Sequence, residues 1–574
     1  MSARLIPSIT EPPLGCPGTS CRNRSAGLHS AVPQVFGLQA AGSSTGRRRS
    51  EPVRQSRRPQ IENLRYSRLQ TCATPKAFAR SLSYRRLGKA RSLLQMAITV
   101  VGAFICAQVP GAVPFVVQGV GVNSNDFRIT VFASGLDFPL GMAKLSDGSL
   151  LVGVSQGPNL FNSTGKLLRF VDVNDDGVAD GPGTVLYSGV LPGTQTDVRL
   201  AGNLVFVTGQ TKPITVLRVG ASPGSPLSLV GRFGIGYSTS WYHPNSGLAV
   251  RDTPGRTNAY DVLFQLGSDS NYGVTTRTLP LTNSNIPGAS GTLHGDSVYM
   301  LTLEDHGTNV TATNLIHIAS GLRNPAGFAF HPTTGDLYFQ DNGIDGFVDA
   351  NEPVSADELN FIARTNLGAS VPYFGFPTNY TEYRTGKTVG GAGIQPLIAF
   401  QPLQDPFTGH ESEGANNIVF APPAFPDGLN TGTFLGFHGR FNLGGRNNEE
   451  NPIVYADPSS GAYFHFIEGQ QPGIGHLDGL LATRDSLFVA DLVSTGDTGN
   501  GSGAGIIYQI KCLATPKRPT LGLRLVGSQT ELRWDRGALQ EAAEVAGPWN
   551  NVREAFSPYL LQQSAPRRFY RTYY

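Results

Sequence analysis

The chain has 574 residues, more than one ordinary core holds, so the sequence predicts several domains or an array of repeats. Glycine (70) and proline (40) are abundant and charged residues make up only 15%, which favours short strands joined by turns over long helices. Residues 1–95 hold 17 basic and 3 acidic residues of a chain whose net charge is +3, so the remainder is acidic, which excludes nucleic acid as an expected partner.

The N-terminal part has the pattern of a leader. Residues 1–84 are basic, rich in Ser, Pro and Arg, and without an apolar period, which predicts disorder. A basic segment at 85–91 precedes an apolar run of about 15 residues that ends near Ala107, as in a secretory signal, and a membrane span needs ~20. We therefore expect a signal peptide over 85–107 and a periplasmic or extracellular bacterial protein without a stable membrane span. An uncleaved anchor, a translation start near Met96 and a basic tail that contacts acidic partners remain alternatives.

Cysteine placement agrees with that interpretation. Cys16, Cys21, Cys72 and Cys106 lie in or before the leader, and only Cys512 follows it. A chain cleaved near Ala107 therefore has no intramolecular disulfide and no zinc-type cysteine cluster.

One pattern recurs between Phe127 and Ile510, at a spacing of roughly 45–70 residues that is typical of propeller blades. Each copy has a strand, a Gly or Pro loop, an apolar strand, a Gly turn and another apolar strand. The six copies are 129–154, 185–207, 247–265, 320–339, 417–437 and 479–490. They predict an all-β six-bladed β-propeller over 120–511. A pair of β-sandwiches explains the strands but not the repeated Gly-apolar-Ala-apolar motif.

After Cys512 the pattern changes. A linker at 514–519 carries two prolines and two positive charges, and strand-like segments follow it. Leu539-Gln540, Gly547-Pro548-Trp549 and Arg568-Phe569-Tyr570-Arg571 resemble a C-terminal module of many secreted bacterial proteins. We expect a small β-sandwich-like module over 519–574, with surface attachment, sorting and carbohydrate contact all open.

An acidic loop follows the first copy of the repeat. Asp172, Asn174, Asp176 and Asp180 stand at positions 1, 3, 5 and 9 of Asp-Val-Asn-Asp-Asp-Gly-Val-Ala-Asp, with Gly177 at position 6. Oxygen ligands at this spacing match the first half of a calcium loop, although no acidic residue stands at position 12. The sequence predicts either a Ca²⁺ site between strands or an Asp-rich turn without metal.

The stretch 320–332 reads Ser-Gly-Leu-Arg-Asn-Pro-Ala-Gly-Phe-Ala-Phe-His-Pro and places Arg323 and Asn324 in the loop that enters a buried strand. It resembles the signature of the soluble glucose/sorbosone dehydrogenase family, quinoproteins that use pyrroloquinoline quinone (PQQ). The resemblance covers about 127–511 and implies that both residues bind PQQ. It also implies that Arg323 lies near the quinone carbonyl, where a guanidinium stabilises developing negative charge.

The same resemblance assigns roles to other loop residues. It implies that His243 is the general base, that Gln195 lies near this base, and that the backbone carbonyls of Gly343 and Ile344 hold Ca²⁺. His438 and Arg440 stand where the family contacts PQQ. No lysine occurs between Lys387 and Lys511, so Arg440 and Arg446 are the possible substitutes for the lysine that binds PQQ in glucose-type members. The sequence departs from the family in having one extra residue between His243 and Gly247, and Ile344 in place of proline.

The function expected is therefore that of a secreted quinoprotein dehydrogenase with PQQ and Ca²⁺ as cofactors. Its partners would be a small sugar, such as an aldose or sorbosone, and an external electron acceptor. Two alternatives stay open: a degenerate propeller that binds a glycan or a protein, and a calcium-dependent hydrolase of the lactonase type.

Overall fold

The computed structural model of the chain describes residues 112–347, 353–401, 414–438, 452–469, 473–553, 555–561 and 568–574. The predicted basic segment and signal peptide lie outside these residues, as does Arg440. In the part described, no helix has both the length and the apolar character needed to cross a membrane. The helices found there are three short 3-10 turns, η1 (Ser124–Asp126), η2 (Leu160–Asn162) and η3 (Arg364–Asn366).

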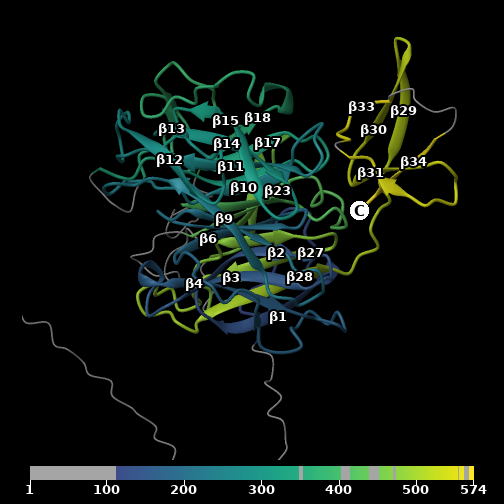
Figure 1. Cartoon of the computed structure of the whole chain (residues 1–574), viewed down its shortest axis with the longest axis horizontal. Coiled ribbons are helices and arrows are strands. Elements are labelled where there is room, and N and C mark those ends of the chain that lie inside the picture. The colour runs from purple at the N-terminus through teal and green to yellow at the C-terminus, as the bar shows by residue number, and fades with distance from the viewer. Residues whose placement is uncertain are drawn as a thin grey trace, which may run out of the picture. The chain divides into compact units, whose positions relative to one another are not determined.

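Six antiparallel sheets follow one another along the chain and form the blades of a propeller (Figure 1). Blade 1 consists of β2 (Pro139–Lys144), β3 (Leu150–Gln156), β4 (Thr164–Phe170) and β5 (Thr184–Val185). Blade 2 consists of β6 (Gln195–Ala201), β7 (Leu204–Gly209), β8 (Ile214–Arg218) and β9 (Ser228–Ile235), and it is extended by β12 (Thr278–Ser284) and β13 (Gly291–His294). Blade 3 consists of β10 (Leu248–Asp252), β11 (Ala259–Leu266), β14 (Ser297–Asp305) and β15 (Val310–Ser320).

Blade 4 consists of β16 (Pro325–Phe330), β17 (Leu337–Asp341), β18 (Glu358–Ile362) and β21 (Ile398–Ala399). Blade 5 consists of β22 (Ala415–Phe420), β23 (Thr433–Phe437), β24 (Ile453–Asp457) and β25 (Ala462–Ile467). Blade 6 consists of β26 (Gly479–Ala482), β27 (Ser486–Asp491), β28 (Gly505–Cys512) and β1 (Phe127–Leu136). A hairpin of β19 (Tyr380–Thr381) and β20 (Thr388–Val389) lies in the connection between β18 and β21.

The inner strands of the six sheets form a closed ring. Strand β2 contacts β6, and contacts then run from β6 to β10, β16, β22 and β26, which returns to β2. Because each sheet is covered on both faces by its neighbours, its strands read as continuous apolar runs. Strand β3, with the sequence Leu-Leu-Val-Gly-Val-Ser-Gln, is buried over six consecutive residues.

Each pair of neighbouring blades encloses one hydrophobic cluster. Phe206 and Phe264 belong to the cluster between blades 2 and 3, Leu263 and Phe328 to that between blades 3 and 4, and the other four junctions have equivalent clusters. Burial of each such side chain contributes about 1.5–3 kcal/mol. The core of this fold is therefore distributed around the ring.

The first strand closes the ring. Strand β1 pairs antiparallel with β28, so the outermost strand of blade 6 comes from the N-terminal side of the propeller. Phe132 on β1 is 3% exposed and packs edge-to-face on Phe488 of blade 6, with ring centroids 5.3 Å apart, and on Phe170 of blade 1. This pairing covers the edge of β28 where the two ends of the array meet, and β1 becomes the outer edge of the sheet.

The last residues form two small three-stranded sheets. The strands are β29 (Leu521–Val526), β30 (Gln529–Trp534) and β33 (Tyr559–Leu560) in one, and β32 (Asn550–Asn551), β31 (Ala538–Ala542) and β34 (Phe569–Tyr573) in the other. Leu532, Trp534 and Leu539 are the buried residues of their shared core. The predicted fold class, a six-bladed propeller followed by a small β module, is confirmed, whereas the exact domain boundaries stay predictions.

The closing strand yields a stability prediction. We expect Phe132→Ala to lower the free energy of unfolding by about 3–5 kcal/mol, because the lost ring leaves a cavity between blades 6 and 1. The change is measured by urea denaturation. Ser134→Ala, exposed on the same strand, is the matched control and should change stability by less than about 0.5 kcal/mol. Equal effects of the two substitutions would contradict the role assigned to Phe132.

Candidate active site

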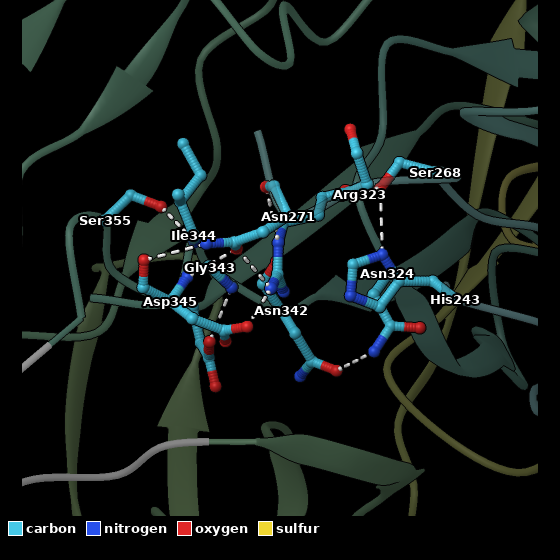
Figure 2. A network of polar contacts seen from close by, with 12 residues as sticks. His243, Ser268, Asn271, Arg323, Asn324, Asn342, Gly343, Ile344, Asp345 and Ser355 are labelled. Atoms are coloured by element: carbon cyan, nitrogen blue, oxygen red, sulfur yellow. Dashed lines mark hydrogen bonds and ion pairs between the residues drawn. The ribbon is translucent and has the colours of Figure 1, made fainter. Parts of the chain in front are cut away.

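Four loops of blades 3 and 4 meet at one end of their sheets. His243 precedes β10 and Asn271 follows β11, while Arg323 precedes β16 and Asn342 follows β17. Strands β10 and β11 are antiparallel, as are β16 and β17, so the start of each first strand lies beside the end of the second. This topology brings together residues that lie up to about a hundred positions apart (Figure 2).

His243 is held as a neutral base. Its imidazole is 8% exposed, and Nδ1 lies 2.8 Å from the hydroxyl of Ser268. That hydroxyl donates its one hydrogen to the carbonyl oxygen of Ser270 (2.6 Å), so we assign the imidazole hydrogen to Nδ1. Burial, and then the positive charge of Arg323, lower the pKa of His243 to about 2. No hydrogen bond is found for Nε2 within the described residues, so its lone pair is available.

Ser268 connects His243 to Arg323. Its carbonyl oxygen accepts the N–H of His243 at 2.9 Å, and its own N–H donates to the carbonyl oxygen of Arg323 at 2.7 Å. Gly267 permits this close approach, since a Cβ there would lie 2.7 Å from the Arg323 oxygen and 2.9 Å from the Cβ of His243. The backbones of His243 and Arg323 are therefore both hydrogen-bonded to Ser268, just after the end of β11.

The guanidinium of Arg323 is buried and almost fully bonded. The residue is 3% exposed. Nε donates to the Asn271 carbonyl oxygen at 3.2 Å, and Nη2 donates to Asn271 Oδ1 at 2.7 Å and forms an ion pair of 2.7 Å with Asp345. Figure 2 shows this group between Asn271 and Asp345. A buried cation needs such partners, so the arrangement fixes both its charge and its direction.

Asn324 points into a second polar chain. Its Nδ2 donates to Asn342 Oδ1 at 2.8 Å, and Asn342 Nδ2 donates to the carbonyl oxygen of Ala415 at 2.8 Å. Ala415 begins β22, so this chain joins the site to blade 5. His438 follows β23 of the same blade, and its N–H donates to Gly414 at 3.2 Å.

A pair of carboxyl groups lies beneath the loop, with Asp341 buried and Glu358 half-buried. Asp341 accepts the N–H groups of Arg323 (2.9 Å) and Asn324 (2.6 Å), and it faces Glu358 across the β17–β18 ladder. Burial raises the pKa of both carboxyl groups, and their mutual repulsion adds to this for Glu358. Because Asp341 accepts two N–H bonds and Glu358 accepts only the amide of Asn360 at 3.1 Å, we place the charge on Asp341 and the proton on Glu358.

A cavity of about 20 Å³ lies beside these groups, room for one water molecule. Arg323, Asp341, Glu358 and Tyr380 are among the residues that line it. The cavity therefore connects the guanidinium to the protonated carboxyl group through a polar space.

Gly343 and Ile344 follow Asn342 in the loop after β17. The N–H of Gly343 donates to Asp357 at 2.7 Å, and that of Ile344 donates to Ser355 at 2.7 Å. The carbonyl oxygen of Ile344 accepts the N–H of Val354 at 2.7 Å. Among the described residues no group of three or more His, Cys, Asp or Glu side chains is placed to hold a metal ion. Calcium binding by the carbonyl oxygens of Gly343 and Ile344 stays a prediction, and no step is routed through it.

The acidic loop lies away from this site, between blades 1 and 6. Asp172 accepts the N–H groups of Asp176 (3.2 Å) and Gly177 (2.9 Å), and Asp180 accepts that of Val173 (2.7 Å). Thr130 of β1 donates to the carbonyl oxygen of Gly177. Asn174 donates to Asp176 at 2.9 Å. The loop is an Asp-rich turn that is hydrogen-bonded to β1, and metal binding there stays a prediction.

Gln195 and His438 are two further predicted residues that the structure describes, and the roles expected for them stay predictions. Gln195 is fully buried at the start of β6, packs over Gly153 and Gly165 of blade 1, and leaves both amide atoms without a partner. The carbonyl oxygen of His438 contacts Nδ1 of His476, and Arg440 lies outside the described residues.

Sequence inspection missed Ser268 and Asn271. Both lie in Gly-Ser-Asp-Ser-Asn, which follows the second strand of the third copy just as Asn342-Gly343 follows that of the fourth. Superposing the six copies would have shown polar residues after the second strand in both blades. No signal in either loop, taken separately, shows that they contact each other.

The guanidinium and the Asn324 carboxamide are hydrogen-bond donors of the kind that fit the carbonyl edge of a quinone, and the imidazole offers an acceptor lone pair. A buried guanidinium, the Asn324 carboxamide and a neutral imidazole with a free lone pair converge at one end of blades 3 and 4. Asp345 already pairs with Arg323, and its side chain is 45% exposed. An anionic ligand would therefore meet Arg323 in competition with this carboxylate.

Comparison with known proteins gives the following similarities. No family model matches the chain. An uncharacterized protein of Borreliella burgdorferi is 43% identical over 60 residues, which span 10% of this chain and 14% of that protein's length.

Solved structures similar to this chain include sugar dehydrogenases. The holo PQQ domain of pyranose dehydrogenase from Coprinopsis cinerea is 15% identical with a TM-score of 0.44, covering 67% of this chain and 96% of that chain. PQQ-bound aldose sugar dehydrogenase from Streptomyces coelicolor is 17% identical with a TM-score of 0.40, covering 67% and 98%. Soluble aldose sugar dehydrogenase from Escherichia coli is 14% identical with a TM-score of 0.42, covering 67% and 99%.

The neutral state of His243 predicts a pH dependence of stability. An ordinary imidazole has a pKa of about 6.5, so between about pH 6.5 and pH 2 the unfolded chain binds one proton more than the folded protein. Stability is therefore lost as pH falls below about 6.5. In His243→Gln we expect the free energy of unfolding to fall less steeply than in the parent protein as the pH is lowered from roughly 5.5 to 4. The two slopes should differ by up to about 1.4 kcal/mol per pH unit.

The measurement is a series of denaturant titrations across this range. His306→Gln, at an exposed turn between β14 and β15, serves as the control and should keep the slope of the parent protein. Identical slopes in all three proteins would show that His243 is protonated in the folded state.

Proposed function

We propose that this protein is a secreted, PQQ-dependent dehydrogenase that oxidises an aldose, sorbosone or a related sugar. The observation that carries the proposal is the neutral His243, whose open Nε2 is held beside the buried Arg323 through Ser268. The sequence resemblance at 320–332 names Arg323 and supplies the cofactor class, and the same family resemblance, at a separate loop, names His243 as the base.

Each of these residues has a defined part in such a reaction. When bound, PQQ supplies a quinone that accepts a hydride from the sugar carbon. His243 Nε2 takes the proton of the sugar hydroxyl as the hydride leaves, and Nδ1–H stays bonded to Ser268, which holds the tautomer. Arg323 stabilises negative charge that develops on an oxygen beside it, and Asn324 offers a carboxamide at the same edge.

Ca²⁺ is retained as the second cofactor, with Gly343 and Ile344 as its proposed backbone ligands, and no step is assigned to it. The reduced cofactor would pass its electrons to an external acceptor. Periplasmic or extracellular localisation belongs to the proposal and is supported by the leader pattern at 85–107.

A second function is favoured by one contact. Asp345 already neutralises Arg323, which suits a propeller that binds a neutral glycan without any cofactor. Binding of PQQ separates the two proposals directly, since only the dehydrogenase requires it.

The first test is titration of the purified full chain with PQQ and Ca²⁺, followed by dye reduction with a panel of aldoses and sorbosone. We expect saturable, sugar-dependent reduction in which His243→Gln lowers kcat by about 10²–10⁴-fold, since the base is lost while its neighbours remain. His306→Gln is the matched control and should retain full activity. Absence of PQQ binding would rule out the dehydrogenase and favour the binding propeller.

A second test concerns the competition at Arg323. In Asp345→Asn the guanidinium loses its charged partner, so we expect PQQ to bind several-fold more tightly, in keeping with the ~0.2–1 kcal/mol of a partly exposed ion pair. Binding is measured by fluorescence or calorimetric titration. Asp147→Asn removes a comparable ion pair with Arg169 in blade 1 and should leave PQQ affinity unchanged. Weaker binding in Asp345→Asn would show that Asp345 positions Arg323 for the cofactor.

A further inference from the structure

Two large aromatic rings lie exposed on the loops that carry Asn271 and Asp345, the partners of Arg323, and take no part in the proposed chemistry. Tyr272 is 47% exposed and Phe347 is 60% exposed. Their ring centroids are 5.4 Å apart with an interplanar angle of 72°. We call this pair the aromatic platform. Single exposed apolar residues are common on protein surfaces, but two rings in contact from separate loops form a shaped apolar surface.

The same side chain that orients Arg323 also joins the loops that carry the platform. Asn271 Oδ1 accepts from Arg323 Nη2 at 2.7 Å and from the N–H of Asp345 at 2.9 Å, and Asn271 Nδ2 donates to the Asp345 carbonyl oxygen at 3.1 Å. Tyr272 follows Asn271 directly, and Phe347 stands two residues after Asp345. The position of the platform is therefore coupled to that of the buried guanidinium.

Polar groups that suit hydroxyls border the platform. The Asp345 side chain is 45% exposed and presents carboxylate oxygens, which accept hydrogen bonds. Tyr380 lines the cavity beneath Arg323, and the electrostatic effect of nearby Tyr272 adds to that of burial in raising the pKa of Tyr380. Rings flanked by a carboxylate and a phenol match a sugar, which has apolar C–H faces and hydroxyl edges.

We infer that the aromatic platform is a subsite for the sugar unit next to the one that is oxidised. The substrate class is then an oligosaccharide that presents its reducing end to His243, rather than a free monosaccharide. This inference rests on the proposed function. A planar electron acceptor is the competing occupant, but it would make no use of the Asp345 carboxylate beside the rings.

The test compares sugars of different length on the purified full chain. Glucose and its α-1,4- and β-1,4-linked dimers and tetramers are titrated calorimetrically without PQQ, and KM and kcat are measured separately by dye reduction with PQQ. Tyr272→Ala and Phe347→Ala remove the platform at exposed positions. Tyr272→Phe and Phe347→Tyr retain a ring, and Tyr573→Ala removes an exposed ring of the C-terminal module.

We expect at least one tetramer to bind more tightly than glucose, and either alanine variant to raise its Kd and KM by roughly three- to tenfold. Glucose constants, the ring-retaining variants and Tyr573→Ala should stay at the parent values. If all lengths bind alike, or if the alanine variants change only the KM of the dye, the subsite is overturned and the dehydrogenase stands. If no sugar is oxidised but tetramer binding still depends on the platform, the dehydrogenase fails and the glycan subsite stands.

Discussion

The pairing of β1 with β28 is the constraint on which the rest of this structure depends. Six blades have no independent core, because every hydrophobic cluster is shared between two neighbours. Closing the array therefore stabilises all of its members at once. The acidic loop after β4 adds to this closure by bonding to Thr130 on β1, and Lys511 of β28 forms an ion pair with Asp175 in the same loop.

A repeated set of hydrogen bonds fixes the loops that enter the first strands of blades 3, 4 and 6. In blade 4 the carboxylate of Asp341, at the end of the second strand, accepts two N–H groups from the loop that enters the first strand. Gln265 does the same in blade 3, and Asp491 does so in blade 6 for Gly475 and His476. Buried N–H groups need such acceptors, and one side chain at a strand end satisfies two of them. In blades 3 and 4, the loops held in this way carry the candidate site residues His243, Arg323 and Asn324.

Burial and charge in this region act together to separate the protonation states of its groups. His243 is kept neutral because both desolvation and Arg323 disfavour the imidazolium. The carboxyl pair of Asp341 and Glu358 holds a proton for the same reason, since two adjacent buried charges of one sign are unfavourable. The site thus offers a base, a fixed cation and a neutral acid within two adjacent blades. Asn271 holds the cation in place, and the exposed ring of Tyr272 follows it directly in the chain.

The sequence by itself determined the number of blades, because each copy repeats a local pattern of apolar strands and Gly turns that neighbouring residues dictate. It also identified His243, Arg323 and Asn324, whose local motifs resemble a known signature. Ser268, Asn271 and the pairing of Tyr272 with Phe347 were decided only by the tertiary structure. Their contacts join loops of two blades, and the residues of the Tyr272–Phe347 pair stand 75 positions apart in the chain. No local sequence pattern encodes which strand ends a closed ring brings together.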